Sequence, residues 1–285
     1  MIHHHLHTHK KTALCALAFS TAILAVGCKK SPEKIDLTST HTTAAETMAP
    51  TETPDETEAT TAEISESSDD AANGGAGAKK VSTKTNTYYS GKVSIAYPDV
   101  LNLSDMQKTE AVDALLKKNA LSVLDAWGIQ PSEDTVNISC EVLSADRNRI
   151  TVIYTGSYQK KDAAEPTYVM YSNTIDVDNV SDIGFDRFAD PYTMAGYVLS
   201  GDCTFQAPTA EQKNLSPNLQ DEWMKVKNET SLDAYTNLFT NADFPVSQTF
   251  PQSFSYEHQG IIYFSIPMPH NLGDYAIVIY APDSK

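Results

Sequence analysis

Basic residues are scarce in this chain of 285 residues: 21 lysines and arginines stand against 37 aspartates and glutamates, giving a net charge of −16 at pH 7. From residue 85 onward there are 26 acids and 13 basic residues. Nucleic-acid binding needs clustered lysines and arginines that displace counterions from phosphates. The composition therefore excludes nucleic acid as a partner. The negative charge would instead attract a basic protein.

The chain also lacks a long apolar run. Its most apolar segment, residues 12–26, is shorter than the about 20 residues that a membrane-spanning helix needs. Lys10 and Lys11 precede this segment and Ala-Val-Gly-Cys ends it at Cys28, which is typical of a secretory signal peptide. The tetrapeptide resembles the bacterial lipobox, in which the cysteine sulfur receives diacylglycerol before cleavage on its N-terminal side. An ordinary signal peptide with an incidental cysteine is the alternative.

Residues 1–27 are thus predicted to be a lipoprotein signal peptide, and Cys28 to be the lipidated N-terminus of the mature protein. Each buried acyl methylene contributes about 0.8 kcal/mol to anchoring. We therefore expect an extracytoplasmic protein whose first partner is the lipid bilayer. The five histidines between positions 3 and 9 would be removed with the signal peptide, so we predict no metal site there.

Aromatic residues are absent between positions 29 and 84, where threonine, alanine, glutamate, serine and aspartate dominate. Such a segment cannot bury enough apolar area to offset backbone ordering, which costs about 1–2 kcal/mol per residue. We therefore expect residues 28–84 to be an acylated cysteine followed by a disordered acidic tether.

Residues 85–285 have the size of one domain with a single core. A capping box of Ser104 and Gln107 predicts the start of a long helix, and Gly128 predicts its end. The apolar residues of this helix fall on one face. They are Val112, Leu115, Leu116, Val123 and Trp127.

Alternation and turn signals predict the other elements. Strands are expected over residues 92–97, closed by Pro98, and over 136–143, 149–158, 167–177, 260–266 and 275–280, and helices over 218–227 and 231–239. This pattern predicts an α+β domain, with a mainly antiparallel sheet packed against one long helix and one or two further helices.

Two motifs resemble a known family. One is Asp-Ala-Ala-Glu-Pro over residues 162–166, and the other is Pro-His-Asn-Leu-Gly-Asp over residues 269–274. They resemble the paired domains of unknown function in the extracytoplasmic part of the anti-sigma-V factor RsiV. The patterns of that family are Gly-Ala-Ala-His-Pro and Pro-His-x-x-Gly-Asp. The second is intact here, whereas Asp162 and Glu165 replace the glycine and the histidine of the first.

The resemblance implies a ligand-binding ectodomain, because that relative binds lysozyme with this region. Lysozyme is basic and the domain is acidic, so the charges are compatible. In other members of the family this domain is joined to a polysaccharide deacetylase domain. No deacetylase domain follows it in this sequence, so we expect that the protein is not an enzyme and needs no cofactor. The hypothesis is a membrane-anchored surface lipoprotein whose non-catalytic domain binds lysozyme or a cell-wall glycan. A wall hydrolase or deacetylase-related enzyme and a structural envelope protein are the alternatives.

Three residues of these motifs are predicted to contact a ligand: His270, Asp274 and Glu165. His270 and Asp274 could act as base and orienter if a nucleophile lay nearby. A satisfied turn is the plainer interpretation, with Asp274 accepting backbone hydrogen bonds and Gly273 at positive φ.

Cys140 and Cys203 are the two cysteines after residue 84. An oxidising exterior allows a disulfide between them if their Cα atoms approach within about 7 Å. Two thiols alone make a poor zinc site, so no metal is predicted. Tyrosines are frequent and could stack on sugars, but alternating strands must point half of them inward.

Overall fold

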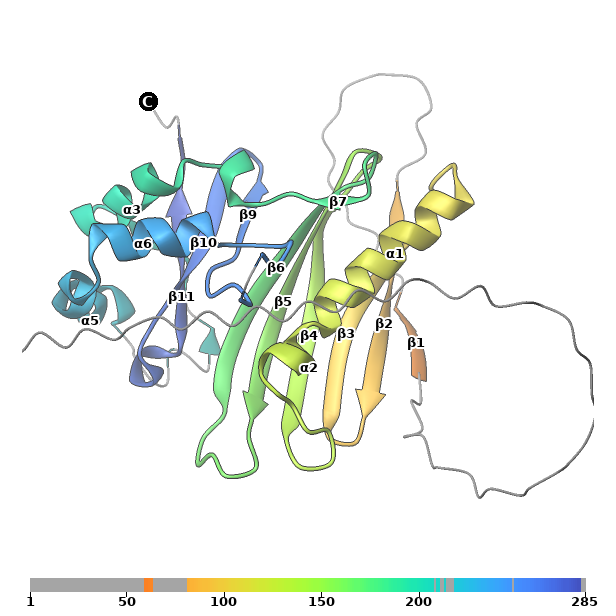
Figure 1. The fold of residues 1–285 in the computed structure, drawn as a ribbon, viewed down its shortest axis with the longest axis horizontal. Helices are drawn as coiled ribbons and strands as arrows, with labels where there is room; N and C mark the ends of the chain where they lie inside the picture. The colour runs from red at the N-terminus through yellow and green to blue at the C-terminus, as the bar shows by residue number, and fades with distance from the viewer. Residues whose placement is uncertain are drawn as a thin grey trace, which may run out of the picture. The chain divides into compact units, whose positions relative to one another are not determined.

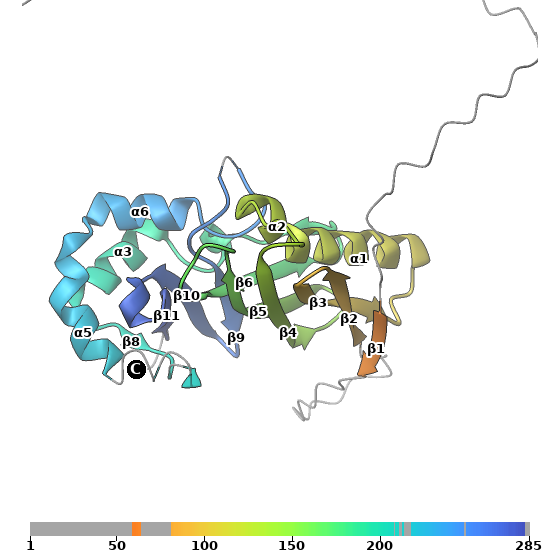
Figure 2. The same cartoon turned by 90° about the horizontal axis from the view of Figure 1, so that it is seen from below.

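The computed structural model describes residues 59–63, 81–207, 209–210, 213, 218–247 and 249–282. All of them belong to one compact unit, Thr53–Lys285. They form two mostly antiparallel sheets with helices (Figure 1, Figure 2), so the predicted α+β class is confirmed. The predicted signal peptide, its histidines and Cys28 lie outside the described residues. None of the helices described is both long and apolar enough to cross a bilayer.

The larger sheet, sheet A, has seven strands in chain order. They are β1 (Ala59–Glu63), β2 (Ser82–Ser90), β3 (Val93–Leu101), β4 (Thr135–Ala145), β5 (Arg149–Gln159), β6 (Thr167–Asp176) and β7 (Ser181–Asp182). Neighbours are antiparallel except β3 and β4, which run parallel. A parallel pair needs a crossover connection, which the helices α1 and α2 supply.

Sheet A begins before residue 85. Val81 and Thr83 are buried, at 3% and 5% exposure, and β2 starts at Ser82. Residues 59–63, within the predicted tether, pair with β2 as strand β1. The prediction of disorder up to residue 84 is therefore wrong for these two stretches. The rest of the predicted tether lies outside the described residues.

The long helix α1 (Met106–Leu121) and the short α2 (Val123–Ala126) lie along one face of sheet A (Figure 2). The N-cap is Asp105, whose Oδ1 accepts from the N–H groups of Gln107 and Lys108 at 2.9 and 3.2 Å. The predicted cap at Ser104 is thus one residue too early. The predicted apolar face is confirmed: Val112, Leu116 and Val123 are fully buried, and Leu115 and Trp127 pack against the same core.

Strand β3 does not end at Pro98, as the sequence suggested, but continues to Leu101. Pro98 pairs with Thr85 of β2, whereas the pairing of β3 with β4 stops at Ile95. Beyond Ile95 the strand has a neighbour on one side only, and proline is tolerated at such edge-like positions.

The smaller sheet, sheet B, has the strand order β8-β11-β10-β9. Its strands are β8 (Thr204–Phe205), β9 (Ser255–His258), β10 (Ile261–Pro267) and β11 (Tyr275–Tyr280). The helices beside it are α3 (Pro191–Ser200), α5 (Leu219–Val226) and α6 (Leu232–Thr240), with single 3-10 turns η1 (Phe185–Arg187), η2 (Lys227–Glu229) and η3 (His270–Leu272). The predicted β10, β11, α5 and α6 are confirmed, whereas α3 lies where the sequence predicted no helix or strand.

The fold has two buried clusters, and the one against sheet A also takes in Phe254 and Tyr256 on the side of sheet B. The cluster of sheet A includes Ile138, Tyr154 and Tyr171, and that of sheet B includes Trp223 and Phe264. The two sheets meet where β6 lies beside β9 and β11. We call this junction the seam. One contact across it is the Ser172 hydroxyl, which donates to the carbonyl oxygen of Ser255 at 2.7 Å.

Candidate functional site

His270, Asp274 and Glu165 meet at one end of the seam. His270 lies in η3 and Asp274 directly precedes β11, while Glu165 lies between β5 and β6. The Nδ1 atom of His270 is 2.9 and 3.1 Å from the two carboxylate oxygens of Asp274, and its Nε2 atom is 2.9 Å from Oε2 of Glu165. The fold thus brings together all three residues predicted to contact a ligand.

The turn around Asp274 is held by its own backbone and by sheet A. Gly273 and Asp274 both have positive φ, +96° and +68°. The Oδ2 atom of Asp274 accepts from the backbone N–H of Tyr168, the second residue of β6, at 2.8 Å. This is the geometry of a satisfied turn, and it also fastens sheet B to the start of β6.

The two carboxylates determine the protonation of His270. Hydrogen bonding to Asp274, and next to Glu165, raises the pKa of His270 above its ordinary value. The protonated ring donates one N–H to each carboxylate. Since both ring nitrogens are engaged, neither is left to take a proton from a nucleophile. The arrangement suits a clasp between the β5–β6 hairpin and sheet B better than base catalysis.

Cys140 and Cys203 are both free thiols. Cys140 packs against the core of sheet A, whereas Cys203 is buried in the core of sheet B. The disulfide that the sequence allowed therefore does not form, because the fold places the two cysteines in separate cores. Burial raises the pKa of each thiol to about 11, which keeps both protonated at neutral pH.

A cleft of about 260 Å³ opens along the seam, and we call it the seam cleft. Residues 167–171 of β6 form one border, and Trp127 and Tyr158 form a wall beside it. The border on the side of sheet B is longer. It comprises Phe250, Pro251, Gln252, Phe254, Ser265, Pro267, Asp274 and Tyr275.

Aromatic rings dominate the wall of the seam cleft. Trp127 and Tyr158 stack with ring centroids 4.6 Å apart and planes inclined by 20°. Phe250 meets Trp127 edge to face at 6.0 Å. All three residues are half-buried and line the cleft. Gln252, at the rim, is exposed.

Sequence reasoning missed the seam cleft. It assigned Trp127 to the core only, and it singled out neither Phe250 nor Gln252. No periodic signal links these positions, since they come from different elements far apart in the chain. The sequence raised eight tyrosines as sugar-stacking candidates: Tyr88, Tyr89, Tyr154, Tyr158, Tyr168, Tyr171, Tyr256 and Tyr263. The first, third, sixth and seventh of these are buried, in agreement with the expectation that half point inward.

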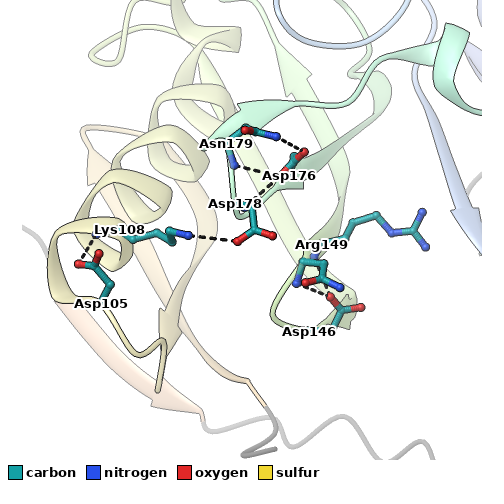
Figure 3. Close-up of polar contacts among 8 residues, drawn as sticks. Asp105, Lys108, Asp146, Arg149, Asp176, Asp178 and Asn179 are labelled. Carbon is teal, nitrogen blue, oxygen red and sulfur yellow. Dashed lines mark hydrogen bonds and ion pairs between the residues drawn. The ribbon is translucent and has the colours of Figure 1, made fainter.

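Acidic side chains gather at the other end of the sheet A strands (Figure 3). Asp146 accepts from backbone N–H groups of the β4–β5 turn at 2.7 Å, and Asp176 does the same after β6 at 2.9 and 3.0 Å. Lys108 pairs with Asp178 at 3.2 Å. These acids therefore serve as turn caps. Across the ranges described, no three histidine, cysteine or acidic side chains are arranged to hold a metal ion.

No family model matches the chain, and no curated protein matches it. Its structural neighbours are DUF3298 family proteins. A DUF3298 family protein from Pseudomonas aeruginosa PAO1 is 8% identical, with 80% of this chain and 90% of that chain covered and a TM-score of 0.33. A member from Bacteroides fragilis NCTC 9343 is 11% identical, with the same coverage and TM-score. Likeness of this degree assigns neither a family nor a function to this chain.

Proposed function

We propose that this protein is an extracytoplasmic lipoprotein, anchored through an acylated Cys28, whose domain binds a cell-wall component in the seam cleft without catalysing a reaction. The seam cleft itself is the observation that carries the proposal. Ligand sites are concave and largely apolar, with a few polar groups that fix orientation. The half-buried rings of Trp127, Tyr158 and Phe250 and the exposed amide of Gln252 match this description.

The walls of the seam cleft are held in place before any ligand arrives. Asp274 binds the Tyr168 N–H, and His270 joins Asp274 to Glu165. A preformed site avoids the entropy loss of ordering its walls upon binding. His270 and Asp274 would therefore position the cleft border, and Asp274 is the predicted ligand-contacting residue that lines the cleft itself.

The anchoring part of the proposal rests on the sequence. Lys10 and Lys11, the apolar run and the Ala-Val-Gly-Cys ending at Cys28 form the expected signal. Mass spectrometry of the membrane-extracted protein should find an N-terminal diacylated Cys28. A leader that is still attached, with no fatty acid, would overturn the anchoring.

The binding test is co-sedimentation of the purified protein with insoluble peptidoglycan sacculi. We expect wild-type protein to sediment and Phe250→Ala to lose at least tenfold in affinity. The matched control is Tyr192→Ala, an aromatic truncation at an exposed side chain on α3. Circular dichroism and thermal melting check that both variants fold. Failure of the wild-type protein to sediment would overturn the proposal.

A second candidate ligand is a basic protein such as lysozyme, which the motif resemblance suggests. The observation in its favour is charge, with 26 acids against 13 basic residues from position 85 onward. Asp178, for example, has 68% of its side chain exposed. Pull-down with lysozyme at low and moderate salt tests this candidate, because electrostatic attraction weakens as ionic strength rises. No capture at micromolar protein in either salt would exclude it.

A further inference from the structure

Sheet A has two faces, and α1 lies on one of them (Figure 2). The Tyr171 hydroxyl donates to the carbonyl oxygen of Ala120 at 2.8 Å, so the Tyr171 side chain points toward α1. Side chains alternate along a strand, so Tyr168 on the same strand points to the opposite face. Ser172 agrees with this assignment, because its hydroxyl donates to Ser255 on the side of sheet B. We call the face away from α1 the far face.

The strand register brings neutral polar side chains together on the far face. Tyr154 of β5 pairs with Tyr171, and Cys140 of β4 pairs with Tyr154, so these three side chains share the face toward α1. Odd-numbered residues of β4 and β5 in this region therefore point to the far face. They are Asn137 and Ser139 on β4 and Thr155 and Ser157 on β5.

The same four residues line a groove of about 330 Å³, which we call the far-face groove. Tyr168, the cross-strand neighbour of Ser157, and Tyr275, the first residue of β11, also line it. Next to the groove the far face is closed, because Ser172 is only 1% exposed. The far-face groove therefore lies where the cover over the far face ends, with a floor of side chains from β4 and β5.

The floor of the far-face groove is fixed before any ligand arrives. The Ser139 hydroxyl donates to the carbonyl oxygen of Thr155 at 3.1 Å, and its Oγ atom lies 3.4 Å from Oγ1 of Thr155. A Cβ atom at Gly156 would collide with the carbonyl oxygen of Asn137, so β4 and β5 approach each other there as only glycine permits. A preformed floor avoids the entropy loss of ordering these groups upon binding.

The charge of the far-face groove indicates its ligand class. None of the described residues that line it is charged, although 20% of the chain is. The seam cleft, by contrast, contains Asp274, and a cleft beside η1 contains Asp186 and Arg187. A charged ligand would lose hydration in the far-face groove without gaining a partner of opposite charge. The groove therefore favours a neutral ligand that is rich in hydroxyl groups.

We propose that the far-face groove binds a neutral, β-1,4-linked saccharide chain. The hydroxyl and amide groups of the floor pair with the sugar hydroxyl groups, and Tyr168 packs against the C–H face of a sugar ring. A β-1,4-linked chain is extended, and each sugar advances it by a step similar to the about 4.8 Å between neighbouring strands. Successive sugars therefore meet successive strands. This inference goes beyond the proposed function, because the groove is a second site with its own floor.

A solvated surface is the alternative, since antiparallel sheets often expose one face to water. Calorimetric titration of the full-length protein decides between the two. The probes are the β-1,4-linked hexamers of glucose and of N-acetylglucosamine, with the α-1,4-linked glucose hexamer for comparison. We expect at least one β-linked hexamer to bind at least tenfold more tightly than the α-linked one, which coils away from a flat floor. No binding of either β-linked hexamer at millimolar concentration, or equal affinity for the α-linked one, would overturn the inference.

The salt dependence tests the neutrality of the ligand. Salt screens attraction between charges but leaves contacts with a neutral sugar unchanged. The affinity for the β-linked hexamer should therefore be the same at low and moderate salt. A tenfold loss at moderate salt would contradict recognition by neutral groups.

Variants locate the binding site. Asn137→Ala combined with Ser157→Ala removes two polar groups of the floor and should weaken binding about tenfold. Tyr168→Ala should have a similar effect, whereas Tyr168→Phe, which keeps the ring, should bind nearly as the wild-type protein does. Tyr192→Ala, at an exposed position on α3, is the matched control and should bind normally. If Tyr168→Ala does not fold, the double variant of the floor still decides, and its unchanged affinity would overturn the inference.

The two proposals can fail separately. Phe250 lines the seam cleft and not the far-face groove. Loss of hexamer binding in Phe250→Ala, with normal binding by the double variant of the floor, would place the sugar in the seam cleft and end this inference alone. Hexamer binding that depends on the floor, in a protein that does not sediment with sacculi, would support this inference and overturn the proposed function.

Discussion

The two sheets are covered in different ways. One helix, α1, runs along sheet A, whereas α3, α5 and α6 gather beside sheet B (Figure 1). The core of sheet B contains the packed rings of Phe185, Phe239 and Phe264, whose centroids lie 5.1 to 5.6 Å apart. The two buried clusters are not divided strictly by sheet, because the cluster against sheet A also takes in Phe254 and Tyr256 on the side of sheet B. The comparison teaches that the seam is part of a shared core, and that the cleft opens where this core reaches the surface.

Two polar links of opposite character lie near the seam, one within the part of the chain that carries sheet B and one across the seam. At the buried link, Asp243 accepts hydrogen bonds from the backbone N–H and the hydroxyl of Ser255. Burial raises the pKa of Asp243 to about 7. At the exposed link, His270 bridges Asp274 and Glu165. The four predictions below test the separation of the cores and then the two links.

The largest effect is expected from Phe264→Ala, which removes a fully buried ring from the core of sheet B. Such truncations cost about 3–5 kcal/mol. If the two cores are separate, hydrogen exchange should lose protection in β10 and β11 while β4 and β5 keep theirs. Phe264→Leu, which retains most of the volume, serves as the control. Equal loss of protection in both sheets would show that they unfold as one unit.

Asp243→Asn tests the buried link. The folded protein holds the proton of Asp243 up to about pH 7, whereas the unfolded chain releases it near 3.8. The protonated Asp243 therefore stabilises the folded protein fully below pH 3.8, and this contribution is lost as pH rises toward 7. A pKa difference of this size corresponds to about 4 kcal/mol in the free energy of unfolding. Urea unfolding between pH 4 and 7 should therefore show a shallower decline in the variant.

The control for this pH series is Asp113→Asn. Burial raises the pKa of Asp113 on α1 to about 6, so this group adds its own decline over a similar range. The decline should shrink further when both substitutions are combined. Identical pH profiles of Asp243→Asn and wild type would contradict the assignment.

Asp274→Ala tests the exposed link and should have an intermediate effect. It leaves the Tyr168 N–H without its partner, and an unpaired backbone donor costs about 1–3 kcal/mol. The pKa of His270 should also fall, because the main cause of its rise is the hydrogen bond to Asp274. Urea unfolding measures the first effect and NMR titration of the imidazole the second. An unchanged His270 titration would refute the clasp.

Glu165→Gln should have the smallest effect. Glu165 has 67% of its side chain exposed, and exposed ion pairs contribute about 0–1 kcal/mol. The raised pKa of His270 means that its contribution is present below its ordinary value of 6.5 and is lost as pH rises through the folded value. The difference between Glu165→Gln and wild type should therefore vanish at alkaline pH. A difference that persists there would point to packing instead of charge.

Local signals predicted much of the fold. The β4–β5 hairpin, the apolar face of α1 and the cap of α6 at Ser231 each depend on residues a few positions apart. Helix α3 was missed although Asp190 and Pro191 give it a cap and a first-turn proline. Strand β2 was missed because Thr83 and Asn86 take buried positions where an apolar residue is expected.

The site depended on contacts that no local pattern encodes. The resemblance singled out His270, Asp274 and Glu165. Glu165 and His270 are 105 positions apart in the chain, and only the fold brings them into contact. The seam cleft was unpredictable for the same reason, since Trp127 follows α2 and Phe250 follows α6, far apart in the chain.

The order of strands in sheet A determines which pair of strands first bears a pull on the N-terminal end of the chain. β1 lies at one margin and β6 lies five places away, which at about 4.8 Å per strand is roughly 24 Å. If the N-terminus is anchored as proposed, tension on it would be borne first by the β1–β2 pairing. That pairing would separate before the load reached β6, which borders the seam cleft.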